Sequence, residues 1–249
     1  MMSIHRTALV TGGMGCLGEA IAKALHDAGH RVLLTHSPGK ENVESWLASR
    51  AQSGYHFTAY PADVTNYDSC AACAELIRAN GQDVDILVNN AGITRDATLR
   101  KLSPVDWNAV LRSNLDSVFN MSKPFCEGMV ERGWGRIVNI SSVNGSKGAF
   151  GQSNYSAAKA GIYGFTKSLA LEVARKGVTV NAVSPGYLDS PMVLKVPKEV
   201  LESQVITQIP VGRLGQAWEI AALVAFICSE AAGFMTGANV AMNGGQHMY

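Results

Sequence analysis

Short apolar runs alternate along the chain with longer stretches of helical periodicity. Near-continuous apolar runs such as ILVN at residues 86–89 and RIVNI at residues 136–140 are typical of strands that are buried on both faces of a parallel sheet. Strands that alternate with helices predict an α/β fold in which helices cover both faces of the sheet. We therefore predict a Rossmann-type, doubly wound parallel sheet of about seven strands.

The order of these runs gives the expected elements. We predict strands at residues 7–10, 31–35, 55–60, 85–89, 136–140, 178–183 and 239–242, and helices at residues 19–28, 41–53, 66–80, 104–131, 155–176 and 216–229. No linker, repeat or low-complexity tract interrupts the alternation, so residues 1–249 are expected to form a single domain. Residues 188–210 are weakly patterned, contain several prolines and follow a strand end, which together predict a substrate lid.

Composition narrows the classes of function. The formal net charge is +1 and no block of like charges occurs, so neither nucleic acid nor an anionic membrane surface is an expected partner. The start of the chain lacks the features of a signal peptide, and the longest apolar run, residues 221–228, is far shorter than the roughly 20 residues that span a bilayer. We expect a cytoplasmic protein that acts on a small molecule.

The five cysteines are an odd number and are expected to be reduced thiols. Cys70 and Cys73 form a C-x-x-C motif, but the motif lies in an alanine-rich helical stretch. No second cysteine pair or neighbouring histidine completes a zinc site. We predict that both residues are small core residues, and we expect no metal.

The segment TALVTGGMGCLGEAI, residues 7–21, places a glycine-rich turn between the first predicted strand and the first predicted helix. Gly12 permits a tight turn, Gly15 lets the backbone approach a pyrophosphate, and Gly18 packs the helix onto the strand. A glycine-rich turn can simply end a strand, but at the first strand–helix junction it predicts a dinucleotide site. The turn residues expected at the cofactor are Gly12, Met14, Gly15, Cys16, Leu17 and Gly18.

The residues after the second predicted strand indicate which dinucleotide is bound. Sites that select NAD carry an acid here, which accepts hydrogen bonds from the ribose 2′-hydroxyl. In this chain the sequence THSPGK has no acid before Glu41, whereas Ser37 and Lys40 can bind a 2′-phosphate. The pattern favours NADPH/NADP+, although Lys40 could also be a solvated residue in the first turn of the next helix.

Tyr155 and Lys159 are four residues apart on a predicted helix and therefore project from one face. A lysine ammonium close to a tyrosine favours the phenolate, so we expect Lys159 to lower the pKa of Tyr155. Tyr155 could then protonate a ketone oxygen while a hydride reaches the carbon. Ser142 follows a predicted strand and could hydrogen-bond the same oxygen. An isolated Tyr-x-x-x-Lys is usually an ordinary helix pair, but here it follows a nucleotide turn and a serine after a strand.

These motifs in this order resemble the short-chain dehydrogenase/reductase family, and the resemblance extends over nearly the whole chain. It implies that Asn114 holds a water in a proton relay from Tyr155, that Lys159 also binds the nicotinamide ribose, and that the backbone after Pro185 binds the carboxamide. The cofactor residues that it implies are Asp63, Val64, Asn90, Ala91, Gly92, Tyr155, Lys159, Pro185 and Gly186. Short family members have glycine where this chain has Cys16, so the approach of the loop to the pyrophosphate is expected to differ.

The segments AGITRDATLRK, GWGRIVNISSVNGSKGAFGQSNYSAAKAG and KGVTVNAVSPGY are similar to family members that reduce 3-oxoacyl thioesters. The similarity implies a 3-oxoacyl-CoA substrate and NADPH-dependent reduction. A thioester of acyl carrier protein is the alternative substrate, and a nucleotide-binding protein without catalysis is a third hypothesis. Intact Ser142, Tyr155, Lys159 and Asn114 argue against the third.

Three residues are expected at the acyl thioester. Gln152 could donate to the thioester carbonyl, Tyr187 could pack on the pantetheine arm, and Asp96 is either a substrate-side residue or an N-cap or turn residue. The cations at residues 132, 175 and 176 could dock a carrier protein or be ordinary helix-end cations. The resemblance also implies a homotetramer that forms through the long central helices and the C-terminal segment.

Overall fold

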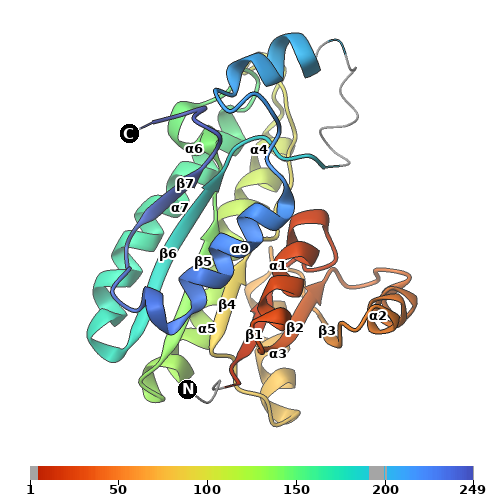
Figure 1. The fold of residues 1–249 in the computed structure, drawn as a ribbon, viewed down its shortest axis with the longest axis vertical. Coiled ribbons are helices and arrows are strands. Elements are labelled where there is room, and N and C mark those ends of the chain that lie inside the picture. The colour runs from red at the N-terminus through yellow and green to blue at the C-terminus, as the bar shows by residue number, and fades with distance from the viewer. Residues whose placement is uncertain (1–4, 191–198, 200, 249) are drawn as a thin grey trace.

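The structure, a computed structural model, describes residues 5–190, 199 and 201–248. Seven parallel strands form one sheet in the order β3-β2-β1-β4-β5-β6-β7, which confirms the predicted fold class. The strands are β1 (Thr7–Val10), β2 (Arg31–His36), β3 (Phe57–Pro61), β4 (Ile86–Asn89), β5 (Gly135–Ile140), β6 (Val178–Pro185) and β7 (Asn239–Met242). Their carboxyl ends lie toward the top of Figure 1, and the N-terminus lies at the opposite end.

The helices begin and end within three residues of their predicted limits, apart from the differences described below. Local capping explains several starts: Asn66 accepts a hydrogen bond from the backbone N–H of Ser69, and Ser103 accepts one from that of Asp106. The α-helices in the described ranges are α1 (Cys16–Asp27), α2 (Val43–Gln52), α3 (Tyr67–Ala79), α4 (Pro104–Leu111), α5 (Ser117–Glu131), α6 (Val143–Lys147), α7 (Ser153–Val173) and α9 (Ala217–Cys228).

Helices cover both faces of the sheet, as the near-continuous apolar strands require. Helices α1 and α9 pack on one face, where Ile21 and Val224 are fully buried against strand residues such as Val88. Helices α3, α5 and α7 cover the other face, where Leu87 and Met121 lie in the core. Figure 1 shows α1 and α9 in front of the strands.

The predicted helix at residues 104–131 is not a single α-helix. A π-helical turn, Arg112–Asp116, joins α4 to α5. Such a turn adds one residue to the helical repeat, which sequence periodicity does not reveal, and it often marks a functional site. Here it contains Asn114, which is buried. The short helix α6 after β5 was also not predicted, because five residues carry too little periodicity.

Part of the predicted lid at 188–210 lies outside the described residues, namely 191–198 and 200. On either side of this part, Leu188 pairs with Gly215 in an isolated bridge and Ile209 is buried. The lid and the single-domain assignment stay predictions. No helix in the described part of the chain is long and apolar enough to cross a membrane.

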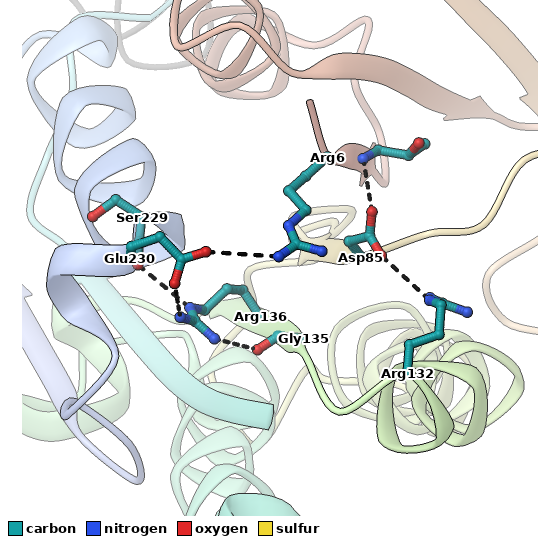
Figure 2. A network of polar contacts seen from close by, with 8 residues as sticks. Arg6, Asp85, Arg132, Gly135, Arg136, Ser229 and Glu230 are labelled. Atoms are coloured by element: carbon teal, nitrogen blue, oxygen red, sulfur yellow. Dashed lines mark hydrogen bonds and ion pairs between the residues drawn. The ribbon is translucent and has the colours of Figure 1, made fainter. Parts of the chain in front are cut away.

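Charged side chains form a network of polar contacts at the amino-terminal edge of the sheet, as Figure 2 shows. Glu230 lies 3.8 Å from the guanidinium of Arg136 and 3.7 Å from that of Arg6. On the other side of the network, Asp85 lies 3.4 Å from Arg132 and accepts a hydrogen bond from the first residue of β1. The network therefore joins the starts of β1, β4 and β5 to the segment after α9.

Candidate active site

Two adjoining cavities lie at the carboxyl edge of the sheet, around the ends of β1 and β4, between which the strand order reverses. One cavity, of about 290 Å³, is lined by the residues after β5 and the start of α7, and we call it the catalytic cavity. The other, of about 600 Å³, is lined by the glycine-rich turn and the ends of β2 and β3, and we call it the nucleotide cleft. The two cavities adjoin, since both are lined by Cys16, Leu17, Asn90, Gly92, Ile93 and Ser190.

The structure brings Ser142, Tyr155 and Lys159 together on the wall of the catalytic cavity. Tyr155 is half-buried and Lys159 is only 4% exposed. The Lys159 ammonium lies 5.6 Å from the centre of the Tyr155 ring and donates a hydrogen bond of 2.9 Å to the backbone carbonyl of Ile140. Ser142 precedes α6 as its N-cap and also hydrogen-bonds the side chain of Tyr155.

The pKa of Tyr155 is shifted upward rather than downward as predicted, and the shift comes from burial rather than from Lys159. Burial raises the pKa of Tyr155 to about 12, and the Ser142 hydrogen bond opposes this rise only in part. Burial also lowers the pKa of Lys159 to about 8, because no carboxylate among the described residues pairs with its ammonium. Tyr155 therefore keeps its proton at neutral pH, which is the state that a proton donor to a carbonyl oxygen requires.

Asn114 completes the group from the π-helical turn. Its side-chain amide donates to the carbonyl oxygens of Ile93 and Val110, at 2.8 and 2.9 Å. Its Oδ1 atom is buried and has no hydrogen-bond partner among the described residues. A Cβ atom on Gly92 would collide with this oxygen and would lie 3.6 Å from the Lys159 ammonium. The free oxygen thus faces the space beside Lys159, where a bridging water would fit the predicted relay.

The glycine-rich turn forms one wall of the nucleotide cleft. Gly12 has a φ of 62°, in the left-handed region that favours glycine. A Cβ atom on Gly18 would collide with the carbonyl oxygen of Gly12, so α1 can lie this close to the turn only with glycine there. Gly15 precedes α1 and gives it no side-chain cap, and uncapped N–H groups at a helix start bind phosphates. These features fit a dinucleotide.

Most of the predicted cofactor residues line one of the two cavities. Met14 does not, because it packs against the core under α1. Those in the nucleotide cleft are Gly12, Gly15, Cys16, Leu17, Gly18, Ser37, Asp63, Val64, Asn90, Ala91 and Gly92. Those in the catalytic cavity include Tyr155, Lys159, Pro185 and Gly186.

Lys40 is exposed and lies outside the residues that line the cleft. The turn at Gly39, where φ is 73°, carries it away, and its backbone N–H donates to the carbonyl of Ser37 at 3.1 Å. Thr35 and His36 line the cleft instead, and the sequence pattern did not predict them. Their place at the end of β2, directly before Ser37, was the signal that could have found them.

On the substrate side, Gln152 and Tyr187 line the catalytic cavity, and Asp96 lies behind Gln152. The Gln152 amide nitrogen, predicted as a donor to the thioester, donates to the Asp96 carboxylate at 2.8 Å. Its amide oxygen accepts from the side chain of Asn144 at 2.9 Å. Asp96 is therefore a side-chain acceptor here rather than a helix N-cap. The Lys147 ammonium lies 6.0 Å from the Tyr187 ring centre.

The three cations considered for carrier-protein docking lie at the amino-terminal edge of the sheet. Arg132 pairs with Asp83 and Asp85, beside the start of β4. Arg175 and Lys176 lie in the short helix that precedes β6. All three therefore lie at the amino-terminal edge, opposite the catalytic cavity of the same chain.

Two of the cysteines, Cys70 and Cys73, lie in the core, as predicted. All five are free thiols, and Cys70 and Cys73 are buried in the core, where burial raises their pKa values to about 12 and 11. Among the residues that the structure describes, no group of three or more histidine, cysteine or acidic side chains could hold a metal ion. Cys16 is the exposed exception, at the first position of α1.

A parallel sheet with a glycine-rich nucleotide turn and a Ser–Tyr–Lys group at its carboxyl edge defines a class of oxidoreductases that use a nicotinamide cofactor. The family model for short chain dehydrogenase matches residues 6–200, and this chain belongs to that family. It is 50% identical to the acetoacetyl-CoA reductase of Cupriavidus necator, over 98% of this chain and 99% of that protein. The acetoacetyl-CoA reductase of Rhizobium meliloti is also 50% identical, over 98% and 99%. A 3-oxoacyl acyl-carrier-protein reductase of Pseudomonas aeruginosa is 43% identical, over 98% of each chain.

Proposed function

We propose that this protein is an acetoacetyl-CoA reductase, which reduces acetoacetyl-CoA to (R)-3-hydroxybutyryl-CoA with NADPH. The observation that carries the proposal is the grouping of Tyr155, hydrogen-bonded to Ser142, with the buried Lys159 ammonium 5.6 Å from its ring centre, in a cavity that adjoins the nucleotide cleft. The choice of thioester rests on the relatives, since the acetoacetyl-CoA reductases are more similar to this chain than the carrier-protein reductase is.

The residues of the catalytic cavity suit the protein's part in this reaction. When bound, the nicotinamide supplies the hydride. Ser142 orients the ketone oxygen by a hydrogen bond, and Tyr155 gives its phenolic proton to that oxygen. The Lys159 ammonium stabilises the phenolate that remains, because a positive charge in a buried site acts strongly on a nearby negative one. The free Oδ1 of Asn114 could hold a water through which Tyr155 regains a proton.

The preference for NADPH is supported by the end of β2. No acid occupies this position, where a carboxylate would accept the ribose hydroxyl of NAD and repel a 2′-phosphate. The cleft is lined here by Thr35, His36 and Ser37, whose side chains can hydrogen-bond a phosphate.

A homotetramer is part of the proposal. The outer faces of α5 and α7 leave Phe119 47% exposed and Leu171 85% exposed, and a shallow pocket between these helices is lined by Phe165 and Leu169. Apolar surface of this kind favours association with a second copy. Gel filtration showing a monomer would contradict this part. The five free thiols support the cytoplasm as the compartment.

The testing experiment compares NADPH oxidation with acetoacetyl-CoA and with the acetoacetyl thioester of acyl carrier protein, and then repeats the better pair with NADH. We expect faster turnover of the CoA thioester and a preference for NADPH. A large preference for the carrier protein would replace the proposed substrate with the alternative, and equal rates with NADH would overturn the cofactor choice. Absence of reduction with both thioesters would contradict the proposed enzyme activity.

A further inference from the structure

We propose that Tyr163 is a positioning residue of the active site, whose hydroxyl holds the backbone of Ser142 so that the serine side chain meets Tyr155. The inference deepens the proposed reductase function and rests on it for its effect on catalysis. Tyr163 lies on α7, one turn after Lys159 and two turns after Tyr155, and so on the same side of the helix.

The Tyr163 hydroxyl is in contact with three polar groups. It donates a hydrogen bond of 2.9 Å to the backbone carbonyl of Ser142, because that carbonyl can only accept. The Ser146 hydroxyl lies 3.0 Å away and the Ser184 hydroxyl 3.1 Å away. Ser184 in turn donates to Asn239 Oδ1 at 2.6 Å. Since Tyr163 gives its one hydrogen to Ser142 and Ser184 gives its own to Asn239, the Tyr163–Ser184 approach is a polar contact without a hydrogen bond, and the hydrogen bond of the phenol joins α7 to the catalytic segment after β5.

The local packing leaves room for this hydroxyl. A Cβ atom on Gly145 would lie 2.8 Å from the Tyr163 oxygen and 2.9 Å from the carbonyl carbon of Lys159, so α6 can lie on α7 only with glycine at 145. Next to Ser142, the Ser141 hydroxyl donates to the carbonyl of Lys159 at 2.8 Å. Hydrogen bonds from the serine segment to α7 thus bracket Ser142 on both sides.

The position of Ser142 matters because its hydrogen bond to Tyr155 opposes the rise in the pKa of Tyr155 that burial causes. The Ser142 carbonyl is also the acceptor for the backbone N–H of Gly145, at 2.9 Å, and starts the first turn of α6. Loss of the Tyr163 hydroxyl would leave that turn with one tie fewer to α7. Ser142 would then sample orientations in which it does not meet the substrate oxygen.

Tyr163→Phe removes the hydroxyl and keeps the ring. Tyr60→Phe is a matched control, because the buried Tyr60 hydroxyl on β3 donates to Gln82 at 2.8 Å and has no contact with the serine segment. The first measurement is amide hydrogen exchange by mass spectrometry over residues 141–148. We expect faster exchange in Tyr163→Phe and unchanged exchange in Tyr60→Phe. This measurement needs no substrate, so it stands even if the proposed reaction is wrong.

The second measurement is a double-mutant cycle on the reduction of acetoacetyl-CoA. We expect Tyr163→Phe to lower kcat by about tenfold with KM and NADPH affinity unchanged, and to cost nothing further in a Ser142→Ala background. Unchanged exchange at residues 141–148 would overturn the proposal. Equal kcat losses in the wild-type and Ser142→Ala backgrounds would also overturn it, since Tyr163 would then not act through Ser142. Failure of the wild type to reduce any 3-oxoacyl thioester would count against the proposed function and leave the exchange result to decide the role of Tyr163.

Discussion

The two edges of the sheet each bury a cation, and they treat it in opposite ways. At the amino-terminal edge, Arg136 is 3% exposed and lies among Glu230 and the carbonyls of Gly135 and Ser229 (Figure 2). Its guanidinium also lies 4.3 Å from the centre of the Trp134 ring. At the carboxyl edge, Lys159 is buried to a similar degree, yet its ammonium donates a hydrogen bond to a neutral backbone carbonyl, that of Ile140.

This difference indicates that Arg136 has a structural role and that Lys159 has a role in the reaction. A buried cation with carbonyls, an acid and an aromatic ring around it is held in one place and stays charged. A buried cation without a counter-charge costs stability, and such a cost persists where the group has a function. The carboxyl edge is therefore electrostatically incomplete, because the Lys159 ammonium has no counter-charge among the described residues. A bound cofactor and substrate would complete it.

The largest expected effect is that of Tyr155→Phe. The ring still fills its place, but no proton remains to give to the ketone oxygen, so kcat should fall by about 10³-fold. NADPH oxidation at saturating acetoacetyl-CoA measures this. Fluorescence titration with NADPH is the control and should give the wild-type affinity. An unchanged rate would contradict the proposed mechanism and the catalytic role assigned to the carboxyl edge of the sheet.

Lys159→Met tests the incomplete edge. Turnover should fall by about 10²-fold, because the phenolate loses its nearest positive charge. The free energy of unfolding should not fall at neutral pH, since a buried cation without a counter-charge has been replaced by an apolar chain of similar length. Urea unfolding gives the stability. A clear loss of stability would show that Lys159 is a structural cation like Arg136.

Arg136→Ala tests the opposite edge. Because the side chain is buried over Trp134, its removal should lower the free energy of unfolding by about 2–4 kcal/mol and leave kcat unchanged. Arg136→Met keeps most of the volume and should lose less. If Arg136→Ala lowers turnover while stability is kept, the division between the two edges is wrong.

Cys16→Gly should have the smallest effect. Cys16 lines both cavities at the start of α1, and we expect its side chain to limit how closely a pyrophosphate approaches the backbone. We expect the Kd for NADPH to fall by a factor of about three to ten. Isothermal titration measures it. Unchanged or weaker binding would show that the thiol does not restrict the loop.

The sequence predicted the sheet well for a physical reason. Strands that are buried on both faces are apolar throughout, so apolar runs such as residues 86–89 could be recognised as strands. Strands β1 and β7 begin and end where predicted. The π-helical turn was not predictable, because one additional residue barely disturbs a helical pattern. That turn sets the position of Asn114. The sequence therefore predicted that Asn114 belongs to the site, but not the helix geometry that places it there.

The candidate site shows the same limit. Spacing brought Tyr155 and Lys159 to one face of a helix, but spacing says nothing about burial, and burial decides the direction of both pKa shifts. Lys40 was expected in the cleft because it is close in sequence to Ser37 at the end of β2. The turn of two residues between Ser37 and Lys40 instead places Lys40 outside the cleft. Tyr163 gave no signal at all, since its role depends on a carbonyl that lies 21 residues away in the chain.

The most direct test of the incomplete edge is the pH dependence of the free energy of unfolding in the wild type and in Lys159→Met. The pKa of Lys159 is about 8 in the folded protein against 10.5 for an ordinary lysine, so the unfolded chain binds more protons between these values. Below pH 8 both states are protonated and the folded state carries the full cost of the buried charge. As the pH rises from about 8 to 10.5, that cost is relieved, and the wild type should gain stability relative to Lys159→Met by up to about 1.4 kcal/mol per pH unit. A difference that stays constant across this range would mean that Lys159 keeps its proton, and would contradict the account.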